Sequence, residues 1–108
     1  MSPDSLVFQT LSSVGIPGAK IAFPEGGAPP LPWFVYRRRK RGELHADDKN
    51  YTTVPHYSVE LLMRENDPQL RDTFEEAIAT LGPYTAYEVW VPTERCFMVT
   101  YDFTYHPE

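Results

Sequence analysis

The chain has 108 residues, about the size of one domain, and a formal net charge of −5. Its hydrophobic content of 42% and aromatic content of 14% exclude a disordered chain, and its one cysteine excludes an intramolecular disulfide framework. No stretch approaches the roughly 18–20 apolar residues of a membrane span, and Asp4 stands where a secretory signal carries basic residues, so we expect a protein of the cytosol.

The first predicted element is a helix over residues 3–14. Ser2 followed by Pro3 is typical of a helix start, because the Ser side chain accepts a backbone N–H and Pro at the first helical position loses no hydrogen bond. Apolar residues then recur at helical spacing, at Leu6, Val7, Leu11 and Val14. Gly15 followed by Pro17 favours an end of the helix at Val14.

The next segment, residues 16–32, contains three Gly and five Pro. Pro lacks a backbone N–H and Gly loses the most backbone entropy, so neither residue type sustains a long strand. We expect this segment to be mostly loop, with a short strand at 19–23.

Two strands are predicted on either side of a polar stretch. Residues 33–39 contain aromatic and β-branched side chains and predict a strand whose basic end leaves the sheet. The second strand is expected to begin at 51–54, to pass a bulge or edge position at Pro55 and to be completed by 57–63. The pattern is close to that of a half-buried strand, because one set of side chains alternates with another: Tyr57, Val59, Leu61 and Met63 with Ser58, Glu60 and Leu62.

A second helix is predicted between Asp67 and Gly82. Asp67 is a favourable N-cap, Pro68 suits the first helical position, and Gly82 followed by Pro83 ends the pattern. The apolar stripe consists of Leu70, Phe74, Ala77, Ile78 and Leu81.

Residues 86–91 and 96–105 predict a hairpin around the turn 92–95. In its second strand five large side chains share one face: Phe97, Val99, Tyr101, Phe103 and Tyr105. This strand is therefore the predicted centre of the core. The order of elements predicts one α+β domain over 1–108, with a mainly antiparallel sheet of four or five strands and two helices packed on one face.

The residues that could bind a metal or take part in catalysis form no recognisable catalytic pattern. His45, His56 and His106 could bind a metal with Asp47 or Asp48, but no two of these residues have a ligand spacing such as H-E-x-x-H, so surface histidines and no metal are expected. Cys96 begins a strand without the surround of a nucleophile, and is expected to be a small packing residue. Neither a P-loop nor a G-x-S-x-G turn is present, so we expect no enzyme and no cofactor.

A basic run at 37–41 is the candidate site: Arg37, Arg38, Arg39, Lys40 and Arg41. These are half of the ten basic residues, and the rest of the chain has five positive against fifteen negative side chains, a net charge of −10. Three interpretations stay open: a solvated arm, an arm that docks on an acidic protein surface, or a salt-sensitive nucleic-acid contact. The net charge of −10 on the rest of the chain would repel a nucleic-acid backbone, except where the arm projects away from the body of the protein.

Several short blocks occur in a characteristic order: GIP at 15–17, FPEGGAPPLPWFVY at 23–36, ADDKNY at 46–51, SVELLMRENDPQL at 58–70 and YEVWVPTERCFMVTYDF at 87–103. In these blocks the chain resembles a family of small siphophage and prophage proteins encoded in the head-to-tail connector module. Members are described as minor structural, tail completion or tail terminator-like proteins. The family usually has a shorter, less basic excursion than the one at 37–41, so the resemblance transfers no role to that run.

The resemblance implies a tail terminator-like α+β fold without catalysis. It implies self-assembly into a ring, commonly a hexamer, at the top of the tail tube, with the tail tube protein and a head-side connector protein as partners. The expected location is the virion at the head–tail interface, and the host cytoplasm before assembly. The alternative from the residues alone is a small nucleic-acid-binding or regulatory module that uses the basic run 37–41.

Overall fold

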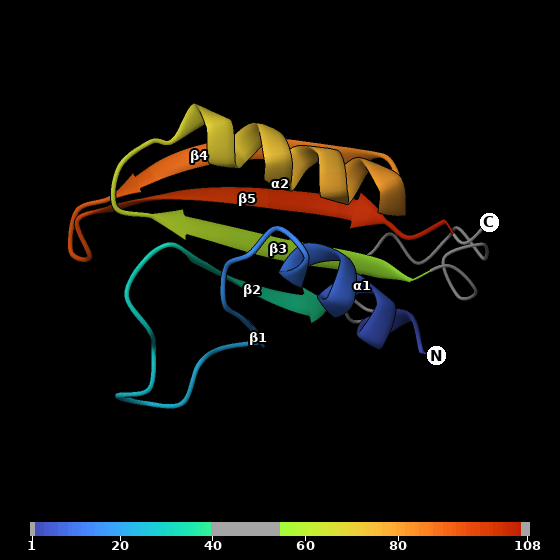
Figure 1. Cartoon of the computed structure of the whole chain (residues 1–108), viewed down its shortest axis with the longest axis horizontal. Coiled ribbons are helices and arrows are strands. Elements are labelled where there is room, and N and C mark those ends of the chain that lie inside the picture. The colour runs from blue at the N-terminus through green and yellow to red at the C-terminus, as the bar shows by residue number, and fades with distance from the viewer. Residues whose placement is uncertain (1, 40–54, 107–108) are drawn as a thin grey trace.

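A computed structural model of the chain describes residues 2–39 and 55–106. These residues form one mixed sheet with two helices on one of its faces (Figure 1). In chain order the elements are α1 (Pro3–Ser12), β1 (Gly18–Lys20), β2 (Trp33–Arg38), β3 (His56–Met63), α2 (Pro68–Leu81), β4 (Tyr84–Val91) and β5 (Cys96–Thr104). The predicted α+β class is confirmed.

The strand order across the sheet is β1-β2-β3-β5-β4. β1 and β2 are parallel, because the proline-rich connection between them crosses back along the sheet, and all other neighbours are antiparallel. The short strand predicted at 19–23 is found at Gly18–Lys20. The predicted strand start at 51–54 lies outside the described residues, and the described strand begins at His56.

Both helices begin at the predicted caps. The Ser2 hydroxyl accepts the backbone N–H of Ser5 at 3.2 Å, and the Asp67 carboxylate accepts that of Leu70 at 3.1 Å. α2 has the predicted extent, whereas α1 ends at Ser12, two residues before the predicted end. The apolar stripes of both helices are buried against the sheet.

The core lies between the helices and one face of the sheet. β3 contributes four fully buried or nearly fully buried side chains, Tyr57, Val59, Leu61 and Met63. β5 contributes the predicted row, although Phe97 is only half-buried. The middle place in the sheet belongs to β3 rather than to β5, so the predicted centre of the core is shared by these two adjacent strands. Each such side chain stabilises the fold by about 1.5–3 kcal/mol.

The opposite side chains of the same strands form a second face, here called the open face. Among the described residues no helix covers it, and it runs from Val35 on β2, through Ser58 on β3 and Thr100 on β5, to Tyr87 on β4. The described part of the fold therefore has one sheet face that both helices cover and one face that no helix covers.

Candidate docking surface

The first part of the basic run 37–41 belongs to the sheet. The structure describes Arg37, Arg38 and Arg39, whereas Lys40 and Arg41 lie outside the described residues. Arg37 and Arg38 are paired in register with β3, and the backbone N–H of Arg39 donates to the carbonyl oxygen of His56 at 2.8 Å. The prediction that the basic end leaves the sheet is wrong for these residues, because β3 is long enough to satisfy their backbone groups.

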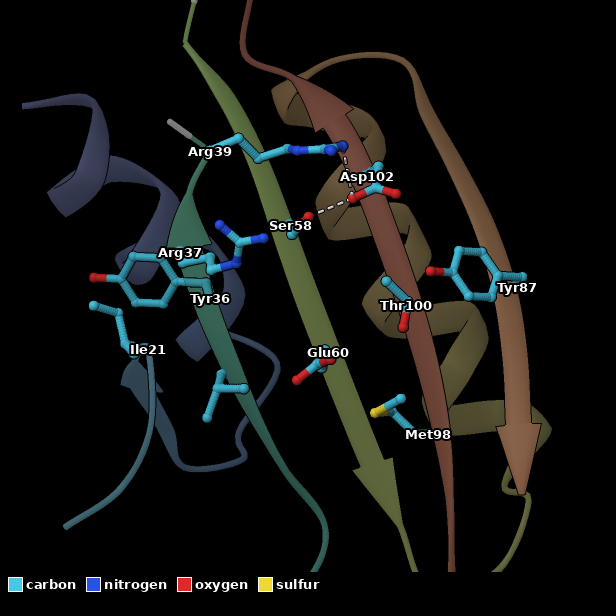
Figure 2. Close-up of a pocket in the computed structure, with 11 residues that line it drawn as sticks. Ile21, Tyr36, Arg37, Arg39, Ser58, Glu60, Tyr87, Met98, Thr100 and Asp102 are labelled. Atoms are coloured by element: carbon cyan, nitrogen blue, oxygen red, sulfur yellow. Dashed lines mark hydrogen bonds and ion pairs between the residues drawn. The ribbon is translucent and has the colours of Figure 1, made fainter. Parts of the chain in front are cut away.

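Strand alternation sends the three arginines to different faces. Arg38 lies on the helix-covered side, where its Nη1 is 4.0 Å from a carboxylate oxygen of Asp4. Arg39 lies on the open face, with its Nη1 3.5 Å from Asp102. Arg37 is exposed and also lies on the open face (Figure 2). The described part of the run therefore consists of two exposed arginines, Arg37 and Arg38, and one half-buried arginine, Arg39.

Asp4 is the centre of a polar cluster that ties α1 to the sheet. Its carboxylate accepts the Tyr57 hydroxyl at 2.5 Å and the Lys20 ammonium at 2.9 Å. The hydrogen bond from Tyr57 holds the pKa of Asp4 below its ordinary value, and burial together with the bond to Asp4 raises the pKa of Tyr57. The cluster fixes the helix, β1 and β3 relative to one another.

A hollow of about 400 Å³ lies on the open face (Figure 2). Its polar part is built on Asp102, which accepts the Ser58 hydroxyl and forms an ion pair with Arg39. Ser58 donates to a carboxylate rather than to an imidazole, so this group lacks the nucleophile–base geometry of a hydrolase. Its groups suit polar contacts with a partner.

Apolar side chains stand at both rims of the hollow. Ile21, just after β1, is 67% exposed, and Tyr87 on β4 is 57% exposed (Figure 2). Val89, two residues further along the same face of β4, is 42% exposed. Tyr87 and Val89 are neighbours on one face of β4, and adjacent exposed apolar side chains are typical of interaction surfaces.

The acidic side of the molecule is α2 together with β4. The acidic residues there are Asp72, Glu75, Glu76 and Glu88. Arg71 bridges this side internally, at 3.6 Å from Glu75 and 3.3 Å from Glu88. The basic strand β2 and the acidic pair α2 and β4 lie on opposite sides of the central strand β3 (Figure 1). The basic and acidic residues, which are separated along the sequence, are therefore also separated in space.

The remaining candidates for catalysis or metal binding are the histidines, the cysteine and the aspartates. Nδ1 of His56 is 2.9 Å from the Thr104 hydroxyl, and burial lowers the pKa of this imidazole. Cys96 is buried, which raises the pKa of its thiol and disfavours the reactive thiolate. His106 is exposed, and His45, Asp47 and Asp48 lie outside the described residues. Within 2–39 and 55–106 no group of three or more His, Cys, Asp or Glu side chains could hold a metal ion.

Comparisons with protein-family models, with curated proteins and with solved structures give no match. None of the helices in the described part of the chain has the length and apolar character needed to cross a membrane.

The rim residues are the part of this surface that the sequence did not single out. Residues 84–91, YTAYEVWV, place apolar side chains on both faces of the strand, on one face Tyr87, Val89 and Val91. A domain whose helices cover one face cannot bury both sets. That conflict between pattern and fold is the signal that would have identified Tyr87 and Val89.

Proposed function

We propose that the chain is a structural subunit of a phage virion, a ring-forming tail terminator or tail completion protein at the head–tail interface. The order of sequence blocks supports this family, and an α+β subunit with an uncovered sheet face agrees with the fold that the family implies. In this role the subunit ends growth of the tail tube and presents a docking surface to a head-side connector protein. No catalytic group is needed for it.

The observation that carries the proposal is the separation of charge across β3. The basic side ends at Arg37, and the acidic side carries Asp72 and Glu76 on the outer surface of α2. A contact between two different patches is heterologous, and repeated rotation of such a contact closes into a ring. Opposite charges set the orientation of that contact more than its strength.

The role is tested by deleting the gene from the phage genome. We expect filled heads with unattached or overlong tails in electron micrographs, because neither end of the joint can be completed. Normal infectious particles would contradict the proposal.

Complementation of the deletion tests the charged contact. Arg37→Glu should lower the titre, and Arg37→Glu combined with Glu76→Arg should restore part of it, because the pair of charges is re-formed in reverse. Arg64→Glu is the matched control, since it reverses an exposed arginine outside the basic run. Equal titres for all three variants would remove the contact from the proposal.

A nucleic-acid-binding or regulatory module is the second candidate, and the five consecutive basic residues of the sequence, of which Arg37 and Arg38 are exposed, favour it. Arg38 and Arg39 already face Asp4 and Asp102, which reduces the charge that is available to phosphates. This function requires DNA binding that weakens steeply with salt and is lost when the five basic residues become Ser. No binding at low salt would exclude it.

A further inference from the structure

Within residues 2–39 and 55–106, β4 is an edge of the sheet that lacks the usual protection. It is the outermost strand, and its register with β5 runs without interruption from Tyr84 opposite Phe103 to Val91 opposite Cys96. Edge strands are usually shortened, bent by a bulge, or furnished with Pro or several charges, because their free backbone groups otherwise recruit another strand. β4 has eight residues, no Pro and one charge, Glu88.

The backbone groups that point away from the sheet can be assigned. The backbone N–H of Thr104 donates to the carbonyl oxygen of Pro83 at 3.4 Å, and hydrogen-bonded pairs alternate along an antiparallel ladder, so the odd-numbered residues of β4 bond to β5. The pairing of β5 with β3 is consistent with this assignment. The backbone N–H of Tyr105 donates to the carbonyl oxygen of Pro55 at 2.9 Å, so the odd-numbered residues of β5 bond to β3 and its even-numbered residues bond to β4. The outward groups therefore belong to Tyr84, Ala86, Glu88 and Trp90.

We propose that two copies of the chain pair through β4, antiparallel, about a twofold axis that passes between the two Tyr87 residues. In this register Tyr84 lies opposite Trp90 of the partner subunit, and Ala86 lies opposite Glu88 of the partner subunit. The outward N–H and C=O groups of these residues then exchange hydrogen bonds pair by pair. The two sheets become one continuous sheet, with all helices on the same side.

The register follows from the side chains. A shift by two residues in one direction places Glu88 opposite Glu88 of the partner subunit, and like charges directly opposite each other destabilise a strand pair. A shift in the other direction leaves Trp90 opposite Gly82 of the partner subunit, beyond the end of the strand. Only the central register gives aromatic pairs at both ends and sets the one charge against an alanine.

The same register brings together the exposed apolar groups of the open face. Tyr87 meets Tyr87 of the partner subunit, and Val89 meets Thr85 of the partner subunit. On the open face the pair would cover Tyr87, which is 57% exposed, and Val89, which is 42% exposed. On the helix-covered face it would cover Trp90, which is 46% exposed and packs against Phe97. Aromatic and β-branched side chains that lie opposite each other stabilise a strand pair. The occupant is therefore a second copy, because β4 complements itself.

The twofold pair is distinct from the ring contact of the proposed function and does not depend on it. An isologous contact closes on itself and cannot continue around a ring. The pair is thus a state of the free chain in solution. It rests on backbone hydrogen bonds and apolar groups, so salt should leave it almost unchanged, whereas a ring contact through Arg37 should weaken in salt.

Oxidative cross-linking of cysteine variants tests the register. Tyr87→Cys should form a disulfide-linked dimer, because residues opposite each other in a non-hydrogen-bonded pair have Cα atoms about 4.5 Å apart, within disulfide reach. Val89→Cys is the matched control on the same face of the strand; its two copies lie about 13 Å apart in this register and should not cross-link. A mixture of Thr85→Cys and Val89→Cys chains should cross-link as a heterodimer. Native Cys96 is buried and serves as background in the wild type.

Sedimentation over a wide concentration range tests the pair itself. The wild type should pass reversibly from monomer to dimer, and Ala86→Pro should raise the Kd about tenfold or more, because it removes an outward N–H without breaking a bond to β5. Circular dichroism checks that this variant folds. A wild type that stays monomeric at every concentration overturns the proposal, as does a dimer that cross-links equally well through residues 87 and 89. A dimer that excludes residue 87 would place β4 against another strand and also overturn it.

Discussion

The two edges of the sheet are built in opposite ways. β1 has three residues, its Lys20 is paired with Asp4, and the chain turns away at Ile21, which has a φ of 69°. β4 has eight residues in unbroken register with β5 and exposes Tyr87, Val89 and Trp90. One edge is closed by its shortness, a charged residue and a backbone turn, whereas the other is long and regular and carries a single charge, Glu88.

The difference separates folding from assembly. The β1 edge is held by interactions within the chain, so changes there should alter stability. The outer surface of β4 contributes little to the folded subunit, so changes there should alter association and leave folding intact. Each substitution below acts on one side of this contrast.

The largest effect is expected for Gly82→Ala, at the junction between α2 and β4. A Cβ at this position would lie 1.8 Å from the backbone carbonyl oxygen of Thr104 at the end of β5, and backbone cannot move aside as a side chain can. We expect a loss of about 3 kcal/mol or more, measured as a lower midpoint of urea unfolding. A loss below that of Gly18→Ala would show that the junction rearranges freely.

Gly18→Ala tests the other edge. A Cβ here would lie 2.1 Å from Cζ of Phe34, whose ring is fully buried and packs 5.6 Å from Phe74 between centroids. The ring must shift or β1 must separate from β2, at a cost of about 1–3 kcal/mol. Hydrogen exchange should become faster at 18–20 and stay unchanged in β4. Faster exchange in β4 instead would contradict the independence of the two edges.

Asp4→Asn weakens the polar cluster that closes the β1 edge. We expect a loss of about 1–2 kcal/mol at neutral pH, because the Tyr57 hydroxyl and Lys20 lose a charged acceptor. The pKa of Asp4 is lowered in the folded chain, so its contribution is present above its unfolded pKa of about 3.9 and is lost as pH falls through the lower, folded value. Wild type and variant should therefore converge in acid.

The same cluster sets an alkaline limit. Burial raises the pKa of Tyr57, so the stability linked to its neutral hydroxyl is present below about pH 10 and is lost as the pH rises through the higher, folded value. Unfolding curves at several pH values measure both limits. Glu25→Gln, which alters an exposed acid in the loop before β2, is the control and should leave the profile unchanged. If the stability of Asp4→Asn stayed below that of the wild type by the same amount at every pH, the assignment of the acid limit to Asp4 would be wrong.

The contrast between the edges also shows which features of the fold can be predicted from the sequence. The caps at Ser2 and Asp67 and the alternation in 57–63 and 96–105 are local signals, so helices, strands and fold class followed from them. Which strand lies at an edge is decided by long-range pairing, which no local pattern encodes. The interleaving of β3 between β2 and β5, which keeps Arg37 and Arg38 in the sheet, was missed for the same reason.

Ile21→Asn should stabilise the chain. A β-branched residue at φ 69° is strained, Asn tolerates this conformation, and a side chain that is 67% exposed loses little packing. We expect a gain of about 1 kcal/mol in the free energy of unfolding. Arg95→Asn, at φ 52° in the turn between β4 and β5, is the control with an unbranched side chain and should gain less. A net loss would mean that Ile21 makes stabilising contacts at the rim of the hollow.

The smallest effect is expected for Val89→Thr in dilute, monomeric protein. Val89 is 42% exposed on the open face, so the replacement should change the free energy of unfolding by no more than about 0.5 kcal/mol. Val59→Thr makes the same chemical change at a fully buried position of β3 and should cost about 1–3 kcal/mol, because the hydroxyl enters the core without solvent. Similar costs at the two positions would mean that β4 is already packed within the subunit. A large difference would instead leave the exposed valine without a role inside the monomer, which is what a strand reserved for a second chain requires.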